Sequence, residues 1–101
     1  MHILYVNEVI EMKVVINKCY GGFSLSKEAY EYLGVDWDNY GYEFRHDRTN
    51  PKLVQCVEEL GYKASGRFAN LAVIEIPDDV QWEIEEYDGI ECVAEVHRTW
   101  Q

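Results

Sequence analysis

The stretch IPDDVQWEIEEYDGIECVAEVHRTW, residues 76–100, decides the fold, because apolar and polar residues alternate along most of it. A period of two is typical of a β-strand with one buried face. Turn-forming residues interrupt the alternation near its middle, so the stretch predicts a β-hairpin. Residues 90, 93, 94 and 97 would also share one face of a helix, but the alternation and the β-branched residues favour a strand.

The register of this hairpin depends on the length of its turn. A two-residue turn would place Ile84 opposite Val93 and would set Trp82 on one face with two glutamates. A three-residue turn at 87–89, with glycine in the left-handed bulge position, instead pairs Ile84 with Cys92 and keeps the apolar side chains together. We therefore expect the three-residue turn.

Acidic residues are concentrated in the same part of the chain. From Ala72 to Gln101 there are nine acids and one base, which is −8 of the formal −10. In the expected register, an acidic face consists of Glu83, Glu85, Glu91 and Glu95. Two uses fit this face: solvated charges that keep a hairpin edge from aggregating, or a surface that a basic partner neutralises.

Length and composition predict one compact domain. With 101 residues, 48% of them apolar, residues 12–101 can form a single α+β domain around one core. Residues 1–11 fit either an N-terminal extension or an added edge strand. The three cysteines, an odd number without paired spacing, predict buried thiols in the reducing cytoplasm. No apolar run reaches the roughly 18 residues that span a bilayer, so no membrane association is expected.

Two short helices have clear end signals. The first is expected to begin after Ser26 as its N-cap and to end at Gly34. For the second, Asn50 is the cap, Pro51 takes the first helical position and Gly61 closes the helix.

Strands are expected at 12–18, at 40–45 and at 71–76, in addition to the hairpin. The resulting fold is α+β, with two short helices packed on a mixed sheet of about five strands that ends in the hairpin.

A second candidate site lies where strands lead into the two helices. Its residues are Lys18, Tyr20, Gly21, Gly22, Arg45, Arg48 and Arg67. Helix N-termini offer free N–H groups to a phosphate, and Tyr20, Phe23 or Tyr42 could stack on a base. Without a Gly-Lys-Ser/Thr motif, the alternative is that the glycines serve a turn and the arginines pair with nearby acids.

Residue patterns for catalysis are weak. His2, His46 and His97 have no metal-ligand spacing with another His or Cys, so neither a metal nor a cofactor is expected. Cys19 could act as a nucleophile only if a histidine lay beside it in space. The sequence therefore predicts a protein that is not an enzyme.

The chain contains the strings VVINKCYGGFSLS, VEELG, VIEIPDDVQWEIEEYDGIE and VAEVHRTW. Over residues 12–100 the chain resembles a family of small, largely uncharacterised proteins of bacteriophages and prophages. It departs from that family at Cys92, where an aromatic residue is common. The resemblance implies an accessory factor that acts on host machinery in the cytoplasm of the host cell.

Two functions follow as hypotheses. The first is a non-enzymatic inhibitor that docks its acidic face, as a mimic of nucleic acid, on a host defence protein with a basic surface. The alternative is a binder that sequesters a nucleotide signal at the two helix N-termini. Direct binding of nucleic acid is disfavoured by the negative charge. Pairing of the last strand across a two-fold axis would give a homo-oligomer, and this alternative stays open.

Overall fold

The computed structural model describes residues 11–96, which contain four β-strands, two α-helices and one 3-10 helix. In chain order the elements are β1 (Glu11–Asn17), α1 (Lys27–Leu33), α2 (Pro51–Leu60), η1 (Gly61–Ala64), β2 (Leu71–Pro77), β3 (Trp82–Tyr87) and β4 (Ile90–Glu95). The α+β class is confirmed. The expected mixed sheet of about five strands is not: the described part has two separate antiparallel pairs, β1–β2 and β3–β4.

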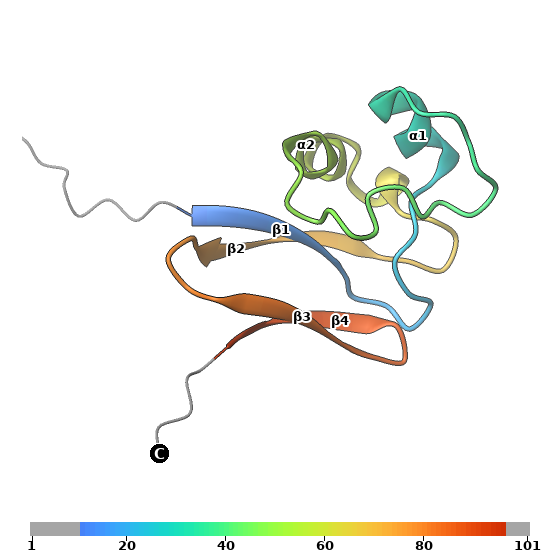
Figure 1. The fold of residues 1–101 in the computed structure, drawn as a ribbon. Helices are drawn as coiled ribbons and strands as arrows, with labels where there is room; N and C mark the ends of the chain where they lie inside the picture. Colours follow the sequence, from blue (N-terminus) through green and yellow to red (C-terminus); the bar gives the residue numbers. More distant parts are fainter. Residues whose placement is uncertain (1–10, 97–101) are drawn as a thin grey trace, which may run out of the picture.

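These elements form three layers (Figure 1). The helices cover one face of the β1–β2 pair, and the β3–β4 hairpin lies along its other face. The main core lies between the helices and β1–β2, where Val15, Tyr30 and Leu53 are almost completely buried. Because both faces of β2 are covered, its sequence is nearly continuous in apolar residues although it has one strand neighbour.

Both helices begin and end where the sequence predicts. The Ser26 hydroxyl accepts a hydrogen bond from the Ala29 N–H at 3.0 Å, and Gly34 ends α1 with a φ of 74°. At the start of α2 the Asn50 side chain accepts from the Lys52 N–H at 2.9 Å, with Pro51 in the first turn. These caps need no distant partner, since each bond spans two or three residues.

Residues 40–45 do not form the expected strand. They lie in a series of turns in which Asn39 and Phe44 have positive φ values of 72° and 65°. The open edge of β1 is instead satisfied further along the chain, where the Val15 N–H donates to the Arg48 carbonyl at 2.9 Å. Arg48 thus bonds to the edge of β1 where a neighbouring strand was predicted.

Ile90–Glu95 forms a strand, as predicted, but the register of the hairpin follows from a two-residue turn and not from the expected three-residue turn. Ile84 pairs with Val93, and Tyr87 pairs with Ile90 across a two-residue turn. Positive φ values of 52° and 91° at Asp88 and Gly89 are those of a type I′ turn, whose twist matches that of the flanking strands. This register places glutamates on the inner face of the hairpin, and one of them, Glu91, pairs there with the buried Arg48.

Cysteine burial follows the prediction only in part. Cys56 is fully buried on the inner face of α2, Cys19 is half-buried and Cys92 is exposed on the hairpin. Residues 1–11 were expected to form either an N-terminal extension or an edge strand. Of this segment only Glu11, the first residue of β1, lies within the described residues. Between residues 11 and 96, no helix has both the length and the apolar character needed to cross a membrane.

Candidate functional site

The four glutamates of the predicted acidic face do not share a surface. Glu83 and Glu85 lie on the outer face of the hairpin, whereas Glu91 and Glu95 lie on the inner face, with Trp82 directly opposite Glu95. The physical reason is the turn, because a shift of one residue moves every side chain of a strand to its other face. The prediction of one repelling four-glutamate face is therefore wrong.

Glu91 is part of a buried ion pair. Its two carboxylate oxygens accept hydrogen bonds from Nη1 and Nη2 of Arg48, at 2.7 and 2.8 Å. Both side chains are only 8% exposed. Burial raises the pKa of Glu91, but the bonds from Arg48 and from the Asn17 N–H, with the Arg48 charge, outweigh it and hold the pKa below its ordinary value.

Asn17, at the end of β1, completes this network. Its side chain is fully buried, and its Nδ2 donates to the carbonyl oxygens of Cys19 and Gly89 at 2.6 and 2.7 Å. Its Oδ1 accepts from the Asn70 N–H at 2.7 Å. Every polar atom of the amide group is engaged, so this one side chain ties the hairpin tip to the end of the β1–β2 pair.

Two members of the predicted phosphate site are thereby excluded from it. Arg48 is used inside the fold, where its guanidinium also lies 4.0 Å from the ring centroid of Phe23. Lys18 is exposed but lines neither of the two large cavities at this end of the molecule. The premise that both helix N-termini open on one sheet edge fails as well, because residues 40–45 form no strand.

The remaining members gather around two adjoining cavities. The first, which we call the aromatic cavity, has a volume of about 430 Å³. It is lined by Gly21, Phe23, Ser24, Leu25, Ser26, Lys27, Trp37, Asn39, Tyr40, Tyr42, Gly66, Arg67 and Phe68. The lining includes two cations and no carboxylate, although the whole chain has a formal charge of −10.

Its aromatic rings are exposed and ordered relative to one another. Tyr40 and Tyr42 stack with ring centroids 5.9 Å apart and an interplanar angle of 14°. Arg45 lies 5.1 Å from the Tyr42 centroid, and Arg67 lies 5.3 Å from that of Phe68. Tyr40 and Phe68 are 68% and 65% exposed, so large apolar surfaces face solvent beside guanidinium groups.

A carboxylate below the rings holds this loop in shape. Oδ1 of Asp38 accepts from the N–H groups of Tyr40 and Gly41 at 2.8 and 2.7 Å, and Oδ2 accepts from the Tyr30 hydroxyl at 2.9 Å. These bonds, that of Gly41 foremost, lower the pKa of Asp38. Burial, with the neighbouring carboxylates, raises the pKa of Tyr30 to about 12, so its hydroxyl stays a donor.

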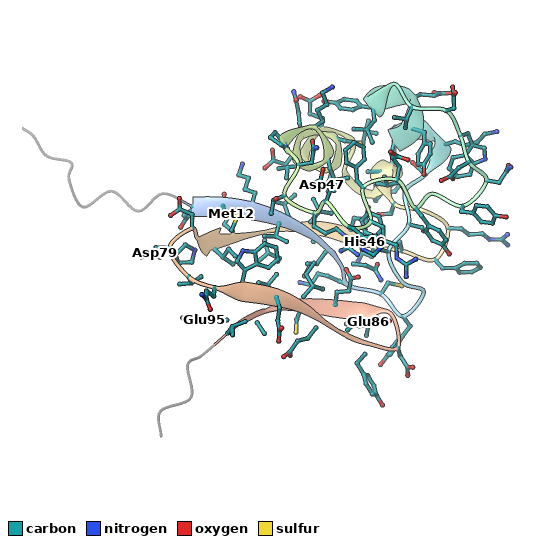
Figure 2. The ribbon with its side chains drawn as sticks, in the orientation of Figure 1. Met12, His46, Asp47, Asp79, Glu86 and Glu95 are labelled. Atoms are coloured by element: carbon teal, nitrogen blue, oxygen red, sulfur yellow. The ribbon has the colours of Figure 1, made fainter. Side chains whose placement is uncertain are left out.

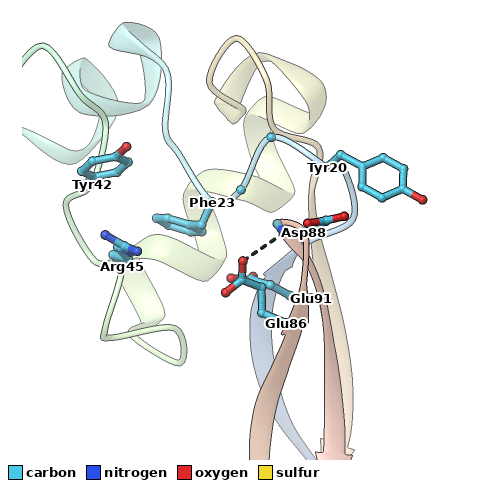
Figure 3. A pocket seen from close by; sticks show the side chains of 10 residues that line it. Tyr20, Phe23, Tyr42, Arg45, Glu86, Asp88 and Glu91 are labelled. Carbon is cyan, nitrogen blue, oxygen red and sulfur yellow. Dashed lines mark hydrogen bonds between the residues drawn. The ribbon is translucent and has the colours of Figure 1, made fainter.

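The second cavity, the hairpin cavity, has a volume of about 560 Å³. It is lined by Tyr20, Gly21, Gly22, Phe23, Tyr42, Arg45, Glu86, Asp88, Gly89 and Glu91. Figure 3 shows Tyr42, Arg45 and Phe23 on one side of it and the carboxylates of Glu86 and Glu91 on the other, while the ring of Tyr20 points away. The two cavities share Gly21, Phe23 and Tyr42.

Close backbone contacts hold the segments around these cavities together. A Cβ atom added to Gly21 would lie 2.0 Å from the carbonyl oxygen of Phe68, and one added to Gly89 would lie 2.1 Å from that of Tyr20. Gly21 therefore serves the packing of neighbouring segments, whereas Gly22 serves the turn through its φ of 87°, and neither has the phosphate-loop geometry of a helix start.

The structure thus assembles Tyr20, Gly21, Gly22, Arg45 and Arg67 around these cavities, and adds residues that the sequence analysis did not select. The added residues include Lys27, Trp37, Tyr40, Phe68, Glu86, Asp88 and Gly89. A weak signal for one of them was present in the sequence, since Phe68 stands next to Arg67 in a segment for which neither a helix nor a strand is expected.

The comparisons with known proteins found no significant match to any family model, curated protein or solved structure. Within residues 11–96 no group of three or more His, Cys, Asp or Glu side chains is placed to hold a metal ion.

Proposed function

We propose that this protein is a non-enzymatic accessory protein of a bacteriophage that sequesters a nucleotide in the aromatic cavity, in the cytoplasm of the host. The observation that carries the proposal is the lining of this cavity: exposed, stacked aromatic rings beside cations, without a carboxylate, on an otherwise acidic protein.

Stacking supplies the first part of the binding energy. A base lying against the Tyr40–Tyr42 pair or on Phe68 would cover aromatic surface that water now contacts. Stacking on protein aromatic rings contributes about 1–3 kcal/mol per base and tolerates different bases. The Asp38 bonds described above hold the Tyr40–Tyr42 loop before any ligand arrives, so little ordering entropy is lost on binding.

Cations supply the second part. Lys27 and Arg67 line the cavity, and neither forms a salt bridge with another of the described residues. They can meet the phosphate of a nucleotide, with Arg67 as the bidentate donor. A long nucleic acid would also meet the acidic hairpin, and this repulsion favours a small ligand over a polymer.

Nothing in the lining supports turnover of the ligand. The residues around the aromatic cavity include no histidine, cysteine, aspartate or glutamate, the side chains that most often act as nucleophilic thiols or as general bases. This composition supports sequestration of the ligand.

The test is a thermal-shift screen of linear and cyclic nucleotides followed by titration calorimetry. We expect at least one nucleotide to raise Tm, and we expect Tyr40→Ala and Arg67→Ala each to weaken its binding by about tenfold or more. Tyr62→Ala is the matched control, since Tyr62 is 79% exposed and lines neither cavity. No shift with millimolar nucleotide, or equal effects of the three variants, would refute the proposal.

A second candidate, inhibition of a host protein with a basic surface, keeps one supporting observation. Between Ala72 and Val96 eight acids are exposed and no base occurs. They are Glu75, Asp78, Asp79, Glu83, Glu85, Glu86, Asp88 and Glu95. They cover both faces and both ends of the hairpin region, as Figure 2 shows for Glu86 at one end and Asp79 and Glu95 at the other.

For this candidate the partner would bind the whole acidic hairpin and not one flat face. The test is capture of host proteins at low and high salt. It compares the native protein with a variant that carries the substitutions Asp78→Asn, Asp79→Asn, Glu83→Gln and Glu85→Gln. We expect the native protein to capture a basic host protein at low salt. This protein should be lost at high salt and with the variant. Capture that is indifferent to both changes would rule out electrostatic docking.

A further inference from the structure

The hairpin cavity adjoins the aromatic cavity, and the proposed function does not use it. We infer that the two cavities together bind a dinucleotide, with one base on the aromatic rings, the linking phosphate at the shared wall, and a guanine base in the hairpin cavity. This inference rests on the proposed function, because the first base occupies the same aromatic cavity.

The shared wall is suited to a phosphate. It contains Gly21 and Phe23, whose backbone N–H groups donate to no acceptor within residues 11–96. Backbone N–H groups without a partner are ready donors to phosphate oxygens. Arg45 lines the hairpin cavity and Arg67 lines the aromatic cavity. A phosphate at the shared wall would therefore have one guanidinium group on each side.

Arg45 is free for this purpose. Within the part of the chain that the structure describes, it forms no salt bridge, in contrast to the expectation that it pairs with Asp47 or Glu43. Its guanidinium lies beside the Tyr42 ring, which lines both cavities. A contact with an aromatic ring leaves the guanidinium N–H groups able to bind an anion.

The far side of the hairpin cavity has the opposite chemistry. Glu86 and Asp88 place exposed carboxylates there, and a carboxylate only accepts hydrogen bonds. Glu86 Oε2 already accepts from the Gly89 N–H at 3.0 Å, so the Glu86 group is held by the turn. Such a pair repels a phosphate but suits a base edge that carries N–H donors.

Guanine is the base that matches this lining. Its Watson–Crick edge presents a ring N–H and an amino group side by side, whereas adenine presents an amino group beside a ring acceptor that a carboxylate repels. Tyr42, which is 49% exposed, gives the ring an apolar surface on the other side of the cavity. The aromatic cavity has no comparable acceptors and stays tolerant of base identity.

The test compares the dinucleotides ApG, GpA and ApA with AMP by titration calorimetry at low salt. We expect ApG or GpA to bind at least about tenfold more tightly than ApA, as one well-placed pair of hydrogen bonds to a base provides. Asp88→Asn and Glu86→Gln should reduce this preference to within about threefold. Asparagine retains the left-handed turn conformation at position 88, so the hairpin should persist.

Asp79→Asn and Glu85→Gln are matched controls, since each removes one exposed charge outside the cavity. If AMP binds but the dinucleotides bind no more tightly, or if the guanine preference survives both cavity variants, the inference is overturned and the proposed function stands. If neither AMP nor any dinucleotide binds, both are overturned.

Discussion

Arg48 and Glu91 are 43 positions apart in the sequence and form a two-bond ion pair that is almost closed to solvent. Arg48 belongs to the loop that borders β1, and Glu91 belongs to the second strand of the hairpin. Through this pair the hairpin layer is fastened to the sheet that carries the helices, and one rim of the hairpin cavity is set. Four predictions follow from this and related contacts.

Removing one partner of this pair should be costly. Arg48→Met leaves the Glu91 carboxylate buried without its countercharge, and we expect a loss of about 3–5 kcal/mol in the free energy of unfolding. Urea denaturation measures it. Adding Glu91→Gln should recover part of the loss, because the amide is neutral and its oxygen still accepts from the Asn17 N–H. Lys13→Met, which breaks an exposed pair with Glu58, is the control, with an expected cost of about 0–1 kcal/mol.

Stability should fall in acid through Glu91. Its pKa in the folded protein is below the ordinary value, so the unfolded chain takes up the proton first as pH falls. The contribution of the pair is therefore complete above about pH 4.3 and is lost as pH falls toward the lower folded pKa. Urea unfolding between about pH 3 and 7 should show a shallower acid slope for Glu91→Gln than for the native protein. Equal slopes would show that Glu91 does not titrate in this way.

Gly21 and Gly22 should respond differently to alanine. A Cβ at Gly21 would collide with Phe68, so Gly21→Ala should displace that segment, lower Tm and weaken ligand binding at the aromatic cavity. At Gly22 the added Cβ meets nothing within 4 Å, but the φ of 87° costs about 1 kcal/mol or more for an alanine. Gly22→Ala should therefore lower stability while ligand affinity is retained. Comparable losses of affinity in both variants would contradict the role assigned to the Gly21 contact.

The cysteines should differ in reactivity. Burial raises the pKa of the Cys56 thiol to about 11, whereas Cys92 is exposed on the outer face of the hairpin. In the native protein a disulfide reagent at about pH 8 should modify Cys92 rapidly and Cys56 only after unfolding. Mass spectrometry of the labelled peptides distinguishes the two sites. Rapid labelling of Cys56 in the folded protein would show that α2 opens without global unfolding.

Local signals in the sequence determined the helices, the strands β1 and β2, and the existence of the hairpin. Their information lies within a few residues: the Ser26 and Asn50 caps bond to residues three and two positions ahead, and the hairpin follows from alternation. The α+β class could be predicted for that reason. Residues 40–45 misled the prediction because their aromatic content suits a strand, whereas Gly41 and two positive φ values impose turns.

Tertiary structure decided the composition of the site, and it made the observed hairpin register favourable, although Asp88-Gly89 is by itself a local signal for a two-residue turn. A glutamate on the inner face of the hairpin is unfavourable unless a cation lies beside it to pair with it. The sequence of the hairpin does not reveal that Arg48 lies beside β1 and can form this pair. The cavities likewise draw their walls from segments around residues 21, 40, 67 and 88. Which exposed aromatic rings and charges meet depends on long-range packing, and this is why the sequence could supply members of the site but not its composition.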